Sequence, residues 1–182
     1  MRRGAAIAAV AIALGVSGIG AYRLAPAPAP AAESADWREI AWPFPRDGWP
    51  AGRAFRCDGA CEGTELYVRA KRGFCNCDRG VADDDEVDRV ADVDLISLRF
   101  AAVAPGEEVG LGEMRGRARR YDLDTADGVR HAAIGIAVSR RCDLFVAAAQ
   151  GHREAGVVQR AALAFLERPE MKLWATAALD GQ

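Results

Sequence analysis

The chain has 182 residues, of which 51% are hydrophobic and 27% are charged, and its formal net charge at pH 7 is −2. Residues 1–31 contain three arginines and no acid, which leaves 21 basic and 26 acidic residues, a net charge of −5, in the remainder. Neutralising phosphates requires a basic surface, so this composition excludes a general nucleic-acid binder. Roughly 145 residues beyond the N-terminal region suit one domain with a single core.

The N-terminal region has the layout of an export signal. Two arginines at positions 2 and 3 precede an uncharged stretch, residues 4–21, and that order is typical of a signal peptide. A helix of these residues would be roughly 27 Å long, just short of the ~30 Å hydrocarbon core. Residues 1–24 are therefore either a signal peptide, cleaved before Ala32, or an N-terminal anchor that tethers the protein to the inner membrane through residues 4–21. Residues 25–36 form a Pro/Ala-rich linker, and we expect a single globular domain over 37–182 in the periplasm.

The first part of that domain predicts irregular chain followed by a hairpin. Residues 37–50 carry three tryptophans and three prolines, and proline removes the backbone donors that a helix or a central strand needs. Residues 53–57 and 64–74 flank a glycine-containing loop, as in a β-hairpin. The second strand alternates between Leu66, Val68 and Ala70 on one face and Tyr67, Arg69 and Lys71 on the other. That alternation predicts one buried face and one solvated face.

The central part predicts a helix and then a meander of strands. Four acids, residues 83–86, mark a helix start, where the helix dipole favours negative charge. Residues 95–103 read as a strand, and residues 112–123 alternate as a second one. Two further strands, 130–138 and 143–149, are joined by the turn sequence SRRCD.

The C-terminal part predicts an amphipathic helix over 153–168, because apolar residues recur at helical spacing until Pro169. A last short element, 170–179, carries Trp174 docked inward. The elements together predict an α+β fold, an antiparallel sheet of about five to six strands with helices packed on it and a C-terminal helix closing the domain.

The sequence contains no recognisable catalytic motif. Ser97 and Ser139 lie in or at the end of predicted strands, and neither G-x-S-x-G nor H-E-x-x-H occurs. His131 and His152 are far apart in the sequence, and we interpret His131 as a sheet residue and His152 as a turn residue. An enzymatic function would require a pocket that joins one of these histidines to a cysteine or a carboxylate, so we do not predict an enzyme.

Three arginines share one face of the strand over 112–123. Arg115, Arg117 and Arg119 are alternate residues, which recur every ~6.6 Å along a strand. Three guanidinium groups in a row can bind an anion or an acidic partner surface. The alternative is a solvated sheet face paired with neighbouring acids.

Four of the five cysteines lie between residues 57 and 77. If Cys57 lies opposite Thr64 in the hairpin, Cys75 is about eleven residues further along, roughly 36 Å away, and a disulfide spans at most ~7 Å. The local Cys57–Cys61 bond is then the natural pairing. Cys75 and Cys77 cannot bond each other in extended chain, so one of them would need Cys142.

Three arrangements of these cysteines stay open. Two structural disulfides can leave one odd cysteine, as suits an exported domain in an oxidising compartment. Cys75, Cys77 and Cys142 can instead form a thiolate site for copper, as Cu(I), or for zinc. The third arrangement is a redox-active pair that exchanges with the spare thiol.

Three segments, residues 42–57, 67–95 and 141–149, resemble a group of uncharacterised exported proteins of alphaproteobacteria. The most specific part of the resemblance is GFCNC followed by GVADDDE, within residues 73–86. The resemblance implies export and a single domain, and it transfers no catalytic residue. The order of elements also resembles the PsbP/Mog1-type fold, which implies no activity.

These observations predict an exported, disulfide-stabilised accessory or binding domain that needs no cofactor and has an unknown protein or small-molecule partner. The alternative is a periplasmic protein that handles copper or zinc, or that exchanges thiols, through Cys75, Cys77 and Cys142.

Overall fold

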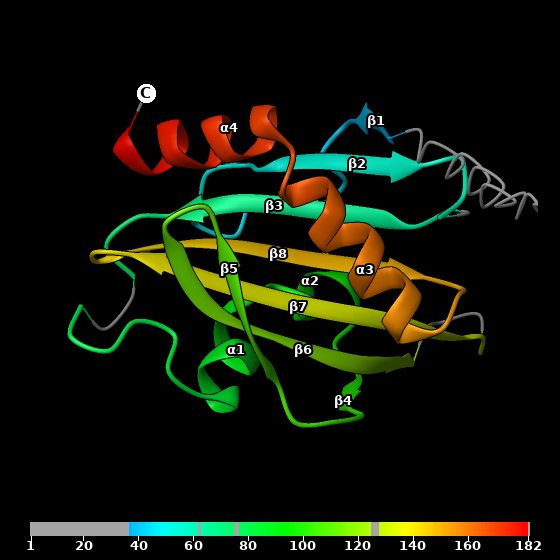
Figure 1. Cartoon of the computed structure of the whole chain (residues 1–182). Coiled ribbons are helices and arrows are strands. Elements are labelled where there is room, and N and C mark those ends of the chain that lie inside the picture. Colours follow the sequence, from blue (N-terminus) through cyan, green and yellow to red (C-terminus); the bar gives the residue numbers. More distant parts are fainter. Residues whose placement is uncertain (1–36, 62, 75–76, 125–127, 182) are drawn as a thin grey trace, which may run out of the picture. The chain divides into compact units, whose positions relative to one another are not determined.

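A computed structural model describes residues 37–61, 63–74, 77–124 and 128–181. These residues form an eight-stranded antiparallel sheet with four helices (Figure 1). The predicted α+β class is confirmed, although the sheet is larger than the five to six strands expected. The signal or anchor and the linker lie outside the described residues. Within residues 37–181 as described, each helix is too short or too polar to cross a bilayer.

The strands are β1 (Trp37–Ile40), β2 (Arg53–Cys57), β3 (Glu65–Lys71), β4 (Phe100–Ala102), β5 (Glu107–Leu111), β6 (Met114–Asp124), β7 (Arg130–Arg140) and β8 (Asp143–Gly151). Their order across the sheet is β1-β2-β3-β8-β7-β6-β4, and β5 also pairs with β6. The segment from β5 to β8 is a meander, as expected, and β3 joins it by pairing with β8. The N-terminal hairpin and the meander therefore form one continuous sheet.

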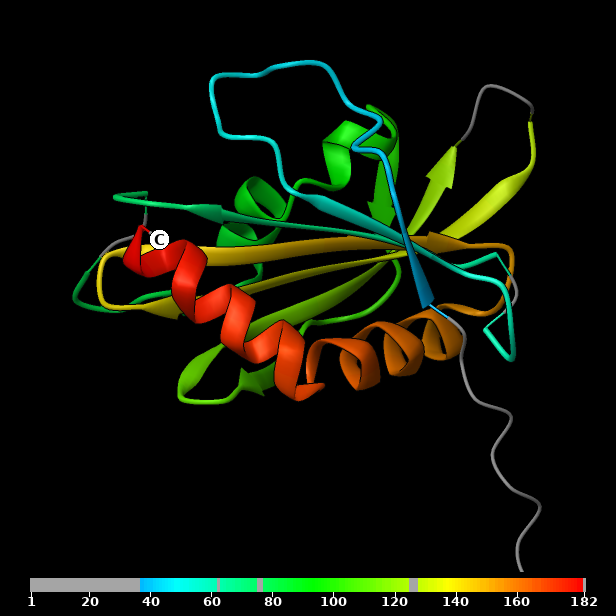
Figure 2. The same cartoon turned by 90° about the horizontal axis from the view of Figure 1, so that it is seen from above.

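One face of the sheet is covered by the C-terminal helices α3 (Ala155–Leu166) and α4 (Pro169–Asp180), as Figure 2 shows with the sheet seen from above. Helix α3 packs on β6, β7 and β8, and helix α4 packs on β3 and β8. The inner stripe of α3 is buried with strand residues such as Phe55, Phe145 and Ile134. The element after Pro169, predicted to be short, is a full helix in which Trp174 contacts Phe145.

The opposite face is covered by helices α1 (Asp84–Val90) and α2 (Val93–Ile96) and by residues 41–52 (Figure 2). Helix α1 starts where the acids predicted it, with the Asp83 carboxylate accepting a hydrogen bond from the Glu86 backbone N–H. Valines of α1 and α2 pack with Tyr121 and Val146 of the sheet. Both faces of the sheet are therefore buried against other elements.

The prediction of a strand over 95–103 was wrong at its N-terminal end. Leu95 and Ile96 belong to α2, and the strand itself begins at Phe100. The additional strands of the sheet are short and lie at or near its edges: β1, β4 and β5 have four, three and five residues. Such short segments carry too little periodicity to be recognised without their pairing partners.

The prediction that one face of β3 is solvated was also wrong. Tyr67, Arg69 and Lys71 are only 3–5% exposed. The Arg69 guanidinium donates to Asp92 (Nη2–Oδ1 2.8 Å) and to Asp47 (Nη2–Oδ2 2.7 Å). The Lys71 ammonium bonds the same Asp92 carboxylate and, at 2.9 Å, the Val90 carbonyl oxygen. Buried charges are tolerated when they are paired in this way, so the charged face of β3 closes against the junction between α1 and α2 and against residues 41–52.

The backbone conformation of Asp92 places its carboxylate within reach of both cations. Its φ of 62° lies in the left-handed region, which aspartate and asparagine tolerate better than most residues. The bend separates α1 from α2, and the Asp92 side chain, 9% exposed, meets both cations of β3. We call Arg69, Lys71, Asp92 and Asp47 the ionic cluster.

Replacing Asp92 with asparagine tests the ionic cluster. Asparagine accepts the same backbone conformation, so Asp92→Asn removes the charge alone and leaves two buried cations with only Asp47. We expect the free energy of unfolding in urea to fall by about 3–5 kcal/mol, as when one member of a buried ion pair is removed. The matched control is Asp124→Asn, whose carboxylate is 74% exposed beside Arg99 and should change stability by less than about 1 kcal/mol. Equal effects of the two substitutions would contradict the role of the cluster.

The acid dependence of stability tests the partly exposed member of the cluster. Hydrogen bonds from Arg69 lower the pKa of Asp47 from 3.8 to about 2. Because the folded pKa lies below the ordinary value, Asp47 stabilises the fold above pH 3.8, and that contribution is lost as the pH falls through about 2. Asp47→Asn should therefore flatten the dependence of the free energy of unfolding on pH in this window by about 1 kcal/mol, after solvent screening. Parallel pH curves for the two proteins would contradict the assignment.

Candidate functional site

The structure pairs two of the three arginines of β6 with helix α1. Arg117 donates to Asp84 (Nη2–Oδ1 2.7 Å) and Arg119 donates to Asp88 (Nη1–Oδ2 2.6 Å). A backbone hydrogen bond from Gly106 and the Arg117 guanidinium lower the pKa of Asp84. The exposed Arg115 donates to the carbonyl oxygens of Gly112 and Met114. Arg117 and Arg119 are thus paired with neighbouring acids, and their side chains are only 20% and 18% exposed.

Four cysteines form two disulfides. Cys57 bonds Cys61 with a Cα–Cα distance of 5.8 Å, and the Cys57 N–H donates to the Thr64 carbonyl oxygen, as the expected hairpin register requires. Cys77 bonds Cys142 across 65 positions, with a Cα–Cα distance of 4.5 Å. In the chain-entropy model such a long loop stabilises by about 4 kcal/mol. Cys75 lies outside the described residues.

These bonds bear on the alternative metal site at Cys75, Cys77 and Cys142. A disulfide offers no thiolate, and thiolate is the form that binds Cu(I) or zinc. Among the described residues, no three histidine, cysteine, aspartate or glutamate side chains are grouped so that they could hold a metal ion.

The structure brings together the two histidines that the sequence separates. β7 and β8 pair so that Ala132 lies opposite Gly151, and the next position on each chain is a histidine. The rings of His131 and His152 are 4.2 Å apart between centroids, with an interplanar angle of 62°. They line a pocket of about 400 Å³ at this end of the sheet, together with Arg56, Asp58, Gly63, Glu65, Gln150 and Gly151.

Both carboxylate oxygens of Glu65 accept hydrogen bonds in this histidine pocket. They accept hydrogen bonds from Arg56, from the Tyr67 hydroxyl and, at 3.0 Å, from Gln150 Nε2. Burial opposes ionisation, but these donors outweigh it and lower the pKa of Glu65. Burial and the adjacent carboxylate raise the pKa of Tyr67. These hydrogen bonds link the end of β2, the start of β3 and the end of β8.

An enzymatic function would require a pocket that joins a histidine to a cysteine or a carboxylate. The histidine pocket meets this requirement in part, because it places two histidines near two carboxylates. The carboxylates, however, are paired elsewhere: Glu65 with Arg56, and Asp58 with Arg38. A general base needs an orienting partner and a nucleophile within hydrogen-bond reach. Among the described residues, no hydrogen bond joins either histidine to a carboxylate, a hydroxyl or a thiol.

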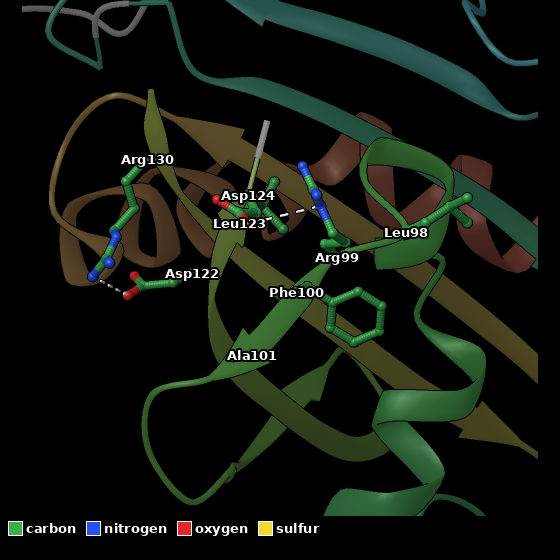
Figure 3. Close-up of a pocket in the computed structure, with 8 residues that line it drawn as sticks. All are labelled: Leu98, Arg99, Phe100, Ala101, Asp122, Leu123, Asp124 and Arg130. Atoms are coloured by element: carbon green, nitrogen blue, oxygen red, sulfur yellow. Dashed lines mark hydrogen bonds and ion pairs between the residues drawn. The ribbon is translucent and has the colours of Figure 1, made fainter. Parts of the chain in front are cut away.

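A second pocket, of about 500 Å³, opens beside β4 and the end of β6. Figure 3 shows two ion pairs at its mouth, Arg99 with Asp124 (Nε–Oδ2 3.7 Å) and Arg130 with Asp122 (Nη1–Oδ2 3.2 Å). Its apolar lining comes from Leu98, Phe100, Ala101 and Leu123. Leu98 is 88% exposed.

Strand β4 leaves one of its backbone edges without a strand partner in the described sheet. Asp124 N–H donates to the Arg99 carbonyl oxygen and Val103 N–H donates to the Arg120 carbonyl oxygen. Antiparallel ladders bond alternate residues, so the N–H and C=O groups of Phe100 and Ala102 point away from β6. Ala101, Ala102 and Val103 are exposed. We call this strand edge and the adjoining pocket the β4 site.

Comparison with known proteins adds no family: no protein-family model matches the chain, and no curated protein sequence matches it significantly. The resemblance to exported alphaproteobacterial proteins stays a prediction.

Proposed function

We propose that this protein is an exported, disulfide-stabilised accessory domain of the periplasm that binds a partner and performs no catalysis itself. Export rests on the arginine pair, the uncharged stretch over residues 4–21 and the linker. The domain is either released by cleavage or tethered to the inner membrane. The two disulfides suit an oxidising compartment.

The observation that carries the binding function is the open edge of β4. Unpaired strand edges are usually short, covered or blocked by charge or proline, because they recruit other chains. β4 is short, but among the described residues no strand pairs with its outer edge, and the exposed Leu98 and Val103 lie on either side of it. An extended segment of a partner protein can add to such an edge through main-chain hydrogen bonds.

The pocket beside β4 defines the kind of segment that fits. Main-chain bonds to Phe100 and Ala102 would supply affinity, and the pocket would select side chains at alternate positions. Its apolar lining suits one apolar side chain of the partner. The rim holds two arginines and two aspartates, each exposed by 39% or more, so it can pair with flanking charges of either sign. We therefore propose an extended protein segment as the partner, in preference to a small molecule.

Photo-crosslinking in the native cell tests the β4 site. A benzophenone side chain placed at position 98 should give one discrete protein adduct, because Leu98 lies on the rim. The same group at Leu173, which is 72% exposed on α4, is the matched control and should give none. Ala102→Pro removes an outward-pointing N–H and should abolish the adduct from position 98. Ala102→Ser keeps that N–H and should retain the adduct.

Melting curves show whether the proline variant is folded, and proline is tolerated at the free side of an edge strand. Equal adducts from positions 98 and 173 would contradict the β4 site, as would an adduct that survives in the folded Ala102→Pro protein.

Thiol counting separates the structural function of the cysteines from the alternative of metal handling or thiol exchange. We expect protein purified from the periplasm without reductant to contain one alkylatable thiol per chain, because four of its five cysteines are paired. Mass spectrometry before and after reduction gives the count and the position. Three free thiols at Cys75, Cys77 and Cys142 that bind Cu(I) or zinc stoichiometrically would overturn the structural interpretation.

A further inference from the structure

The two histidines of the chain form a cross-strand pair created by the register of β7 and β8. The sequence contains no other histidine. Arg140 lies opposite Asp143 at the turn, and Ala132 lies opposite Gly151 at the far end. The same register places His131 opposite His152, one position beyond the last ladder pair. Their rings then meet edge to face at 4.2 Å between centroids.

His131 has a buried nitrogen that is not hydrogen-bonded. Its Nε2 atom is inaccessible to solvent and has no hydrogen-bond partner. A buried polar atom without a partner costs about 1–3 kcal/mol, so the site gains from any species that binds this nitrogen. A neutral imidazole nitrogen is a common metal ligand in proteins.

The separation of the rings suits a shared metal ion. With metal–nitrogen bonds of about 2.0–2.1 Å, two imidazoles on one ion have ring centres roughly 5 Å apart. The observed separation is 4.2 Å, and His152 is the exposed member of the pair. The pocket also carries two carboxylates, Asp58 and Glu65, which are paired with the guanidinium groups of Arg38 and Arg56.

We infer that His131 and His152 form a two-imidazole site for a divalent transition-metal ion. Cu²⁺ binds such nitrogen sites more tightly than Ni²⁺ or Zn²⁺. Because Glu65 and Asp58 are already paired, water or an external donor completes the coordination. The site therefore has fewer protein ligands than the closed four-ligand sites that stabilise folds. It is also chemically distinct from the thiolate site considered for Cys75, Cys77 and Cys142, which would select Cu(I) or zinc.

Copper titration of the full chain, produced without a histidine tag, tests this inference. The background variant Cys75→Ser excludes binding through a thiol. Equilibrium dialysis should give one Cu²⁺ per chain, and pulsed electron paramagnetic resonance should detect two coordinated imidazole nitrogens. His131→Gln and His152→Gln should each reduce that number to one, and the double variant should lose stoichiometric binding. Binding should also weaken in acid, because protons compete for the imidazole nitrogens.

Several outcomes would overturn the site: no stoichiometric binding, a single imidazole nitrogen in the unmutated background, or binding that persists in the double variant. Circular dichroism and melting curves show whether each variant is folded. His152 is exposed and lies beyond the end of β8, so His152→Gln should fold normally. That variant alone decides the proposal if His131→Gln does not fold.

Discussion

The buried ionic cluster is the interaction on which the rest of the structure depends. Arg69 and Lys71 point from β3, the third strand across the sheet, into a face that would otherwise be exposed to solvent. Asp92 bonds both cations, and Asp47 supplies the second negative charge. Asp92 lies in a left-handed turn of the backbone after the end of α1. Desolvating two cations is unfavourable unless a partner is held in place. The cluster therefore fixes the junction between α1 and α2 and residues 41–52 over β3, and with them the closure of the second face.

Closing both faces determines where a partner or ligand can reach this sheet. Helices α3 and α4 cover one face, and α1, α2 and residues 41–52 cover the other (Figure 2). Among the described residues, accessible parts of the sheet include its edges, one of which is β4, and the end at which β7 begins and β8 stops. The β4 site and the histidine pocket lie there, and Arg130 and His131, one from each site, are neighbours in the chain. Their location follows from the packing of the faces.

Much of this arrangement could be predicted from local signals. The acid run gave the start of α1, and strand geometry identified Cys57–Cys61 and a bond from the CNC segment to Cys142. The burial of Arg69 could not be predicted, because its partners are 22 and 23 positions away and period-two alternation does not show what covers a face. The histidine pair did leave a signal. A hairpin with its turn at Arg141 and Cys142 places position 131 opposite 152, so the predicted strands, extended in register, already implied the contact.

The two ends of the β7–β8 hairpin have different chemistry. At the turn, Cys142 is bonded to Cys77, which ties the meander to the segment after β3. The histidines lie at the other end, roughly 30 Å away along the strand at ~3.3 Å per residue. Neither disulfide needs to open for the imidazoles to bind a metal, and a metal there cannot draw on the thiol of Cys142. Reduction should therefore loosen the turn without removing imidazole ligands. The disulfide that stabilises the turn and the histidines proposed to bind a metal therefore lie at opposite ends of the same hairpin.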